Sequence, residues 1–354
     1  MNNYIKKIAC KHIRSLKPYK SARMIGGVGS IFLNANEFPI PIPFNLNNSM
    51  FNRYPECQSK DLLLKYANYS SVSIQNILIS RGSDEAIELL MKVFCTPKKD
   101  CIITFPPTYS MYSKISEIYN IKNKSIFLNF DHGFSLSNFM NALDDVKLIY
   151  ICRPNNPTGE FLSFSNIINI LNVTYKKALV IIDEAYIEFC YSYSLVYLLN
   201  FYSHLVILRT LSKSFGLAGI RCGFTLANKQ TINLLKKVIA PYPLPSPVID
   251  IAIQALSNFH INIMKDRILK LNRNKIWLLQ NLRKISIIEK IFNSVTNYIL
   301  IKTISSKNVF QILWKQGIIV RNQDHEFSSK GYIRISVGTT MECLNIIHSL
   351  KNIK

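Results

Sequence analysis

The chain has 354 residues, of which 48% are hydrophobic and 18% are charged. This composition is typical of a globular protein with room for two domains, and it excludes an intrinsically disordered chain. The formal net charge of +22 raises the question of nucleic-acid binding, but Lys and Arg occur singly or in short pairs, without a basic tail. Asn, Ile, Lys and Tyr have AT-rich codons and are abundant, so codon bias can explain the charge. We expect no nucleic-acid partner.

Signals for export, membrane insertion and metal binding are missing from the sequence. It contains no run of 18 apolar residues, and its basic N-terminus contains no uninterrupted apolar stretch of the secretory kind. The eight cysteines form no CxxC pair, and the six histidines show no HxxxH or HExxH spacing. We therefore expect a cytoplasmic protein with reduced cysteines, no metal site and no membrane partner.

The first two thirds of the chain alternate between short apolar segments and amphipathic ones. Strands are predicted over 76–80, 146–152, 178–183 and 204–210. Helices are predicted over 83–94, with Ser83 as N-cap, and over 165–177. Buried β-branched runs of this length fit a parallel sheet that is covered on both faces. The pattern predicts a large, doubly wound, mostly parallel α/β domain.

A proline cluster at 241–247 is expected to end a helix and to make a stiff connection. Long helical periodicity follows over about 248–285, then short strands over 297–303 and 332–337. This part of the chain indicates a smaller α+β domain. We expect the large domain to span 46–247, and the small domain to combine 1–45, including an N-terminal arm, with 248–354.

Polar segments follow three of the predicted strands. They are RPNNPTG at 153–159, Asp183-Glu184-Ala185-Tyr186, and TLSKSFGLAGIRCG at 210–223. Asp183 lies 27 residues after Asn156, and Lys213 lies 30 residues after Asp183, so each interval suits one strand-plus-helix unit. Because α/β sheets bind ligands at the carboxyl ends of their strands, we expect these side chains to meet in one crevice.

These residue types together suit pyridoxal phosphate (PLP) chemistry. A partly buried Asp183 needs a cation, and the protonated ring nitrogen of PLP is one. A desolvated Lys213 can form an imine with an aldehyde and then move a proton. Thr210, Ser212 and Arg221 supply phosphate-binding groups, and the helix start at 80–85 offers free backbone N–H groups. Taken singly, Asp183 is an ordinary strand-end acid and Lys213 a surface lysine; their order and spacing favour the joint interpretation.

PNNPTG, DEAY and SKSFGLAGIRCG resemble the three signature segments of the fold-type I, class I/II aminotransferases, in the same order. The resemblance extends from about residue 33 to residue 339. Within that superfamily, the sequence looks most similar to the histidinol-phosphate aminotransferases. The segments that point to this subgroup are 16–19, 52–58, 105–112, 221–228 and 318–323.

The resemblance implies a histidine-biosynthesis transaminase that depends on PLP and binds it through Lys213. It implies that Asp183 pairs with the pyridine nitrogen, that Asn156 and Tyr186 bind the ring oxygen O3′, and that Tyr109 stacks on the ring. The phosphate ligands would be Ser83 and Asp84 (through backbone amides), Thr210, Ser212, Arg221 and, from the partner subunit of a homodimer, Tyr54. Substrate binding would fall to Arg334, Arg321, Tyr19 and Asn36.

The implied substrates are histidinol phosphate, which bears a phosphate, and glutamate or 2-oxoglutarate, which bear two carboxylates. A pair of arginines can serve either anion.

Arg153 departs from the family, where a small residue is more common. We expect it to point away from the cofactor; an inward orientation would weaken the substrate assignment. The N-terminal arm, with Tyr4, Ile5, Ile8 and Ile13, is interpreted as packing at the dimer interface.

Alternatives of two kinds stay open on the sequence. Within the same fold, the chain could be an aromatic or general aminotransferase, or a PLP decarboxylase of a phosphorylated amino acid. From another class, it could be a basic binding protein that keeps a degenerate PLP fold. The intact set Asn156, Asp183, Tyr186, Lys213 and Arg221 argues against this last alternative.

Overall fold

The computed structural model describes residues 8–19, 21, 29–46, 51–127, 134–304 and 306–353, without the side chains of 306–308. The predicted residues Tyr4 and Ile5 of the N-terminal arm lie outside this part. The rest of the arm includes helix α2 (Lys11–Ser15), which lies against α5 (Met111–Ile118). The imidazole Nε2 of His12 is 3.2 Å from the carbonyl oxygen of Ile118.

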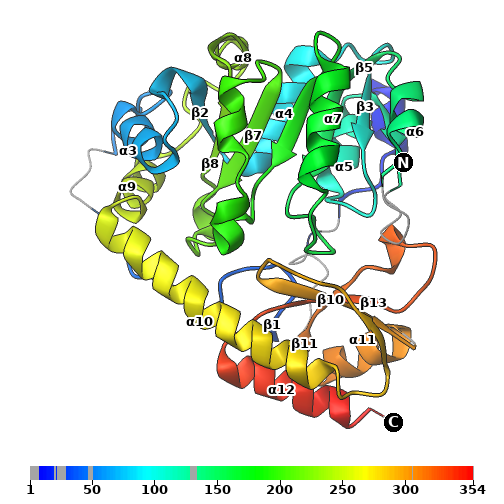
Figure 1. Cartoon of the computed structure of the whole chain (residues 1–354). Helices are drawn as coiled ribbons and strands as arrows, with labels where there is room; N and C mark the ends of the chain where they lie inside the picture. Colours follow the sequence, from blue (N-terminus) through cyan, green and yellow to red (C-terminus); the bar gives the residue numbers. More distant parts are fainter. Residues whose placement is uncertain are drawn as a thin grey trace.

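A seven-stranded sheet forms the larger half of the molecule (Figure 1). Its strands, in the order β2-β8-β7-β6-β5-β3-β4, are β2 (Ile77–Ser80), β8 (Gly223–Ala227), β7 (Leu205–Thr210), β6 (Leu179–Asp183), β5 (Val146–Cys152), β3 (Cys101–Thr104) and β4 (Lys122–Ser125). The strands from β7 to β4 are parallel, and β8 is antiparallel to both of its neighbours. The four predicted strands are confirmed; β3, β4 and β8 were not predicted.

Both faces of this sheet are covered, as its apolar strands require. On β5, Leu148 and Tyr150 face one core and Ile149 and Ile151 the other. The first core contains residues of α4 (Gly82–Phe94), α5 and α8 (Lys229–Leu235). The second contains residues of α3 (Lys60–Ser70), α6 (Leu136–Asn141), α7 (Phe164–Thr174) and α9 (Ser246–Ala255). The doubly wound, mostly parallel α/β prediction is confirmed.

The smaller half contains two further sheets. One has the order β12-β13-β10-β9 and consists of β12 (Arg321–Asn322), β13 (Tyr332–Ser336), β10 (Tyr298–Thr303) and β9 (Ile288–Ile291). In the other, β1 (Ile31–Phe32) pairs in parallel with β11 (Ile318–Ile319). Helices α11 (Ser306–Lys315) and α12 (Thr340–Lys351) complete this half. Short 3-10 helices lie at Ile74–Asn76, Ile187–Tyr193, Val196–Asn200, Ala218–Ile220 and Asp324–Glu326.

The helical region after the proline cluster differs from the prediction of one long helix. It forms α9, which ends at Ala255 with Leu256 as C-cap, and α10 (Asn258–Leu282). Ser257 caps the start of α10, its hydroxyl accepting from the backbone N–H of His260. In Figure 1, α10 runs from the large sheet to the small half, where it packs against α12. This helix therefore joins the two halves.

The predicted N-cap at Ser83 is wrong. Helix α4 begins at Gly82, with Arg81 as its N-cap. Gly82 has φ +77°, a conformation that glycine adopts without strain, so the chain can turn into the helix with its N-cap two residues earlier than expected. Ser83 therefore lies in the first helical turn, where backbone N–H groups have no partner within the helix.

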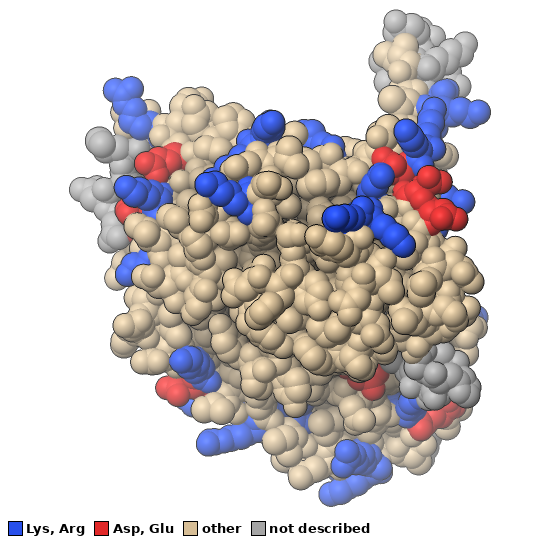
Figure 2. Space-filling view, turned by 45° about the horizontal axis from the view of Figure 1, so that its top comes forward, with Lys and Arg blue, Asp and Glu red and all other residues tan. Residues whose placement is uncertain are grey.

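The described helices and the charged surface add two observations. Among the described residues, no helix is both long and apolar enough to cross a bilayer. Figure 2 shows Lys and Arg as separate groups around one face, with a broad area of uncharged residues between them. On this face the positive charge is not gathered into a continuous basic surface.

Candidate active site

The three predicted segments meet in one cavity of about 530 Å³ between the sheets. Asn156 follows β5, Asp183 ends β6 and Lys213 follows β7, and all three line it. Because these strands are adjacent and parallel, their carboxyl ends lie side by side. The convergence expected from the sequence spacing is present.

Lys213 lies in the cavity and interacts with the small half of the molecule. Its Nζ donates to the carbonyl oxygen of Ala35 at 3.0 Å. Burial, reinforced by the positive charge of Arg334, lowers the pKa of Lys213 to about 8. The amine is therefore far closer to its nucleophilic, neutral form at physiological pH than an ordinary lysine.

Asp183 is almost fully buried, and burial raises the pKa of its carboxyl group to about 6. Two neutral donors oppose that effect. The hydroxyl of Tyr112 donates to Oδ2 at 2.8 Å, and the backbone N–H of Ala185 donates to Oδ1 at 3.0 Å. Tyr112 was not predicted as a site residue, although it lies three residues after Tyr109 and the two rings are in contact, with centroids 5.6 Å apart.

Asn156 and Tyr186 lie on the side of the cavity nearest the small half. Arg334 Nη1 donates to Asn156 Oδ1 at 2.5 Å, which directs the Asn156 amide N–H groups elsewhere. Asn36 Nδ2 donates to the Tyr186 hydroxyl at 2.9 Å, so the hydroxyl proton is left for another acceptor. Asn36 was expected near the substrate's anionic end; its buried side chain lines the adjoining cavity and also contacts Tyr186.

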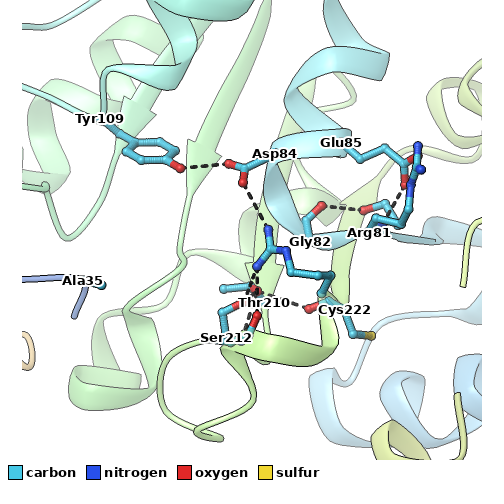
Figure 3. Close-up of polar contacts among 12 residues, drawn as sticks. Ala35, Arg81, Gly82, Asp84, Glu85, Tyr109, Thr210, Ser212 and Cys222 are labelled. Carbon is cyan, nitrogen blue, oxygen red and sulfur yellow. Dashed lines mark hydrogen bonds and ion pairs between the residues drawn. The ribbon is translucent and has the colours of Figure 1, made fainter. Parts of the chain in front are cut away.

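The opposite end of the cavity gathers groups that suit a phosphate (Figure 3). Arg221 Nη1 lies 3.4 Å from Ser212 Oγ, and Thr210 Oγ1 donates to the same oxygen at 2.9 Å. The Asp84 carboxylate accepts from Arg221 Nη2 at 3.1 Å and from the Tyr109 hydroxyl at 2.9 Å. The Arg221–Asp84 pair is half-exposed, so it contributes little and a bound anion can replace it.

The start of α4 approaches this end very closely because two glycines meet there. A Cβ added to Gly223 would lie 2.6 Å from the carbonyl carbon of Gly82 and 2.8 Å from the backbone nitrogen of Ser83. Only a residue without a side chain allows β8 to come this near to the first turn of α4. The free N–H groups and the positive end of the helix dipole thereby face the cavity.

A second cavity of about 150 Å³ adjoins the first and shares Lys213, Tyr109, Tyr186 and Tyr19 with it. Arg321, Arg334 and Asn36, which the resemblance assigned to substrate binding, line it. Three further lining residues, Gln323, His325 and Glu326, were not predicted. They lie in the loop between β12 and β13. Gln323 ends segment 318–323, which carried part of the family resemblance, whereas His325 and Glu326 lie in no segment that the sequence analysis named.

Two residues that the sequence analysis discussed, Tyr54 and Arg153, do not line either cavity of this chain. Tyr54 is 80% exposed and stacks on Tyr242, with ring centroids 4.3 Å apart. Arg153 points away, as expected: its guanidinium donates to the carbonyl oxygens of Leu162 and Tyr193 and lies 4.5 Å from the ring centroid of Phe161. Its role is to hold the loop after β5.

The donor set fits PLP in each of its parts. A buried carboxylate could pair with a cationic ring nitrogen, a lysine with a lowered pKa could condense with an aldehyde, and a glycine-lined helix start with Arg221 could donate to a phosphate. The cavity volume is in the range of small-ligand sites. Fold and site together define a PLP-dependent enzyme of fold type I.

Comparison with known proteins agrees with this class. Residues 32–350 match the family "Aminotransferase class I and II". The histidinol-phosphate aminotransferase of Buchnera aphidicola subsp. Schizaphis graminum is 51% identical over 99% of both chains, and that of Serratia proteamaculans is 47% identical over 98% of this chain and 96% of its own. The Sinorhizobium meliloti histidinol-phosphate aminotransferase, crystallised with PLP, superposes with a TM-score of 0.84 at 19% identity, covering 97% of this chain and 96% of its own. The chain belongs to the histidinol-phosphate aminotransferases of the class I and II aminotransferase family.

Proposed function

We propose that the chain transfers the amino group of L-histidinol phosphate to 2-oxoglutarate, giving imidazole-acetol phosphate and L-glutamate, as a step of histidine biosynthesis. The main support is the pair Arg321 and Arg334, which line the cavity next to Lys213. The two half-reactions need one site for a phosphate and for a carboxylate, and guanidinium groups bind both. Tyr19 adds a hydroxyl at the same cavity.

Bound PLP supplies an aldehyde that condenses with amines and a ring that withdraws electrons from the substrate Cα. We assign the proton transfer to Lys213. Since its amine has a pKa of about 8, a useful fraction is neutral and can accept a proton from Cα and return it at C4′ of the cofactor. The hydrogen bond from Nζ of Lys213 to the Ala35 carbonyl oxygen holds the amine inside the cavity before it reacts.

We assign binding of the polar atoms of the cofactor ring to three side chains, and the stacking contact with the ring to Tyr109. Asp183 would hold the proton on the pyridine nitrogen, because a buried carboxylate is stabilised by an adjacent cation. Asn156 and Tyr186 would donate to O3′, since Arg334 and Asn36 already occupy their acceptor sides. Both side chains line the cavity, so their N–H and O–H groups are available to an acceptor there.

We assign the cofactor phosphate to the backbone amides of Ser83 and Asp84 and to the side chains of Thr210, Ser212 and Arg221. The support is the donor geometry around Ser212 Oγ and the proximity of β8 to the start of α4. Together these groups would anchor the cofactor while the bond to Lys213 is exchanged.

We propose that the enzyme is a homodimer in which Tyr54 of each subunit reaches the partner's phosphate site. In one chain, Tyr54 is exposed and Arg221 and Asp84 are half-exposed. A further cavity of about 440 Å³ adjoins them, with Met111, Ile115 and Ile118 among its apolar lining residues. A second copy would cover this opening and exclude water from the phosphate.

We further propose a cytoplasmic location and the domain division 46–247 against 1–45 plus 248–354. The location is supported by the eight cysteines, all of which are free thiols. The division is supported by the sheets. All strands of the large sheet lie between residues 77 and 227, while the strands of the smaller sheets precede residue 33 or follow residue 287.

The decisive experiment is a single half-reaction. Purified holoenzyme is mixed with histidinol phosphate, and the absorbance is followed for conversion of the cofactor from its pyridoxal to its pyridoxamine form; 2-oxoglutarate should reverse the change. Conversion by phenylalanine or aspartate but not by histidinol phosphate would favour a general aminotransferase. Release of CO2 would favour a decarboxylase. Protein that takes up no PLP would end the enzyme assignment.

A further inference from the structure

Tyr112 lies behind Asp183, outside the cavity. It is fully buried in the first turn of α5 and is absent from the residues that line the cofactor cavity, yet its hydroxyl donates to Asp183 Oδ2 at 2.8 Å. Only one other neutral donor, the N–H of Ala185, contacts the carboxylate among the described hydrogen bonds. Half of the neutral hydrogen bonding to this carboxylate therefore comes from Tyr112.

The Tyr112 ring is fixed by its neighbours. It stacks on Tyr150, with centroids 4.9 Å apart and an interplanar angle of 17°, and meets Tyr109 edge-on at 5.6 Å and 86°. Tyr150 is equally buried, but its hydroxyl donates to the carbonyl of Ile87, away from the site. Tyr150 is therefore a tyrosine of the same core whose hydroxyl does not contact the site. The hydroxyl of Tyr112, in contrast, donates to Asp183.

We infer that Tyr112 is a positioning residue that keeps Asp183 a weak base, so that the proton shared with the cofactor's ring nitrogen stays on the nitrogen. The inference rests on the proposed pairing of Asp183 with that nitrogen. A hydrogen bond to the charged form of a carboxyl group favours that form. Without it, the buried carboxylate binds the proton more tightly, the ring nitrogen becomes neutral, and the ring withdraws fewer electrons from Cα.

The test compares Tyr112→Phe with Tyr150→Phe, which removes an equally buried hydroxyl from the same stack. Holoenzyme is prepared with PLP labelled with ¹⁵N in the ring, and solid-state NMR reports whether that nitrogen is protonated. Tyr112→Phe should move the signal toward the unprotonated ring and slow the glutamate half-reaction about tenfold, with little change in KM. Tyr150→Phe should keep the wild-type signal and a rate within about twofold.

A wild-type signal and rate in Tyr112→Phe overturn the inference. If that variant does not fold, 3-fluorotyrosine at position 112 keeps the ring and makes the phenol a stronger donor. A more protonated ring would then support the inference, and an unchanged signal or a shift toward the unprotonated ring would overturn it. Asp183→Asn separates this idea from the proposed function. An unchanged signal in Asp183→Asn refutes the pairing itself, whereas a change there with none in Tyr112→Phe refutes only the role of Tyr112.

Discussion

In the cofactor-free protein, Lys213 should react with an aldehyde at neutral pH far faster than an ordinary lysine. Burial and the charge of Arg334 lower its pKa from 10.5 to about 8. At pH 7 roughly one such amine in ten is neutral, against about one in three thousand for a lysine of unshifted pKa, a difference of about 300-fold. Because the neutral form is the nucleophile, reactivity should rise with pH through about 8 and level off above it.

The assay is trapping of the cofactor at a series of pH values. Cofactor-free protein is mixed briefly with PLP and reduced with borohydride, and the label at each lysine is measured by peptide mass. Lys275 provides an internal comparison, since burial also lowers its pKa to about 8. Its Nζ donates to the carbonyl of Thr296 at 2.8 Å and does not line the cofactor cavity, so it should label far less than Lys213.

A labelling midpoint near 10 at Lys213 would refute the reasoning from burial. Equal labelling of Lys275 would refute the reasoning from the cavity. Arg334→Gln tests the charge contribution, because removing a nearby cation should move the Lys213 midpoint upward. If the midpoint stays in place, the electrostatic part of the explanation is wrong and burial acts alone.

Three further outcomes concern the scaffold. Arg209→Met should lower the free energy of unfolding by about 3–5 kcal/mol in urea titrations, because Glu184, 2.7 Å from Arg209, would be left buried without its partner. Gly223→Ala should lower it by about 1–3 kcal/mol and speed loss of PLP on dialysis, since its Cβ would collide with Gly82. Gly219→Ala is the control, because its Cβ meets nothing within 4 Å. Arg153→Met should lower the melting temperature but leave the KM for histidinol phosphate unchanged, because the guanidinium of Arg153 donates to the carbonyl oxygens of Leu162 and Tyr193, neither of which lines the two cavities. An altered KM would contradict that placement.

The part of the site that the sequence predicted best is the part built by adjacent parallel strands. Strand ends in neighbouring βα units must lie side by side, so the spacing of Asn156, Asp183 and Lys213 was sufficient to bring them together. The orientation of Arg153 was also predicted, because a residue one step beyond a strand has a restricted choice of faces. These inferences needed only local geometry.

The residues that the sequence did not reveal depend on contacts between distant segments. Tyr112 is one of 18 tyrosines, and nothing in its neighbours indicates that its hydroxyl points to Asp183 and not to a carbonyl group, as that of Tyr150 does. Strand β8 was missed because it is antiparallel to both neighbours, so it lies outside the alternating pattern of parallel strands and helices. His325 and Glu326 reach the cavity lined by Arg321 and Arg334 only because β12 and β13 pair.

The charged groups of the site are held in the fold at a cost in free energy, and PLP would reduce that cost. Burial shifts Asp183 and Lys213 each toward the neutral form, so both charges are held at a cost. Arg221 meanwhile uses Asp84 as its counter-ion in a half-exposed pair of little strength. PLP brings a complement for each: a cationic ring nitrogen, an aldehyde that consumes the amine, and a phosphate. Because the arrangement of Asp183, Lys213 and Arg221 exists only in the folded chain, PLP that binds to these residues would also stabilise the fold.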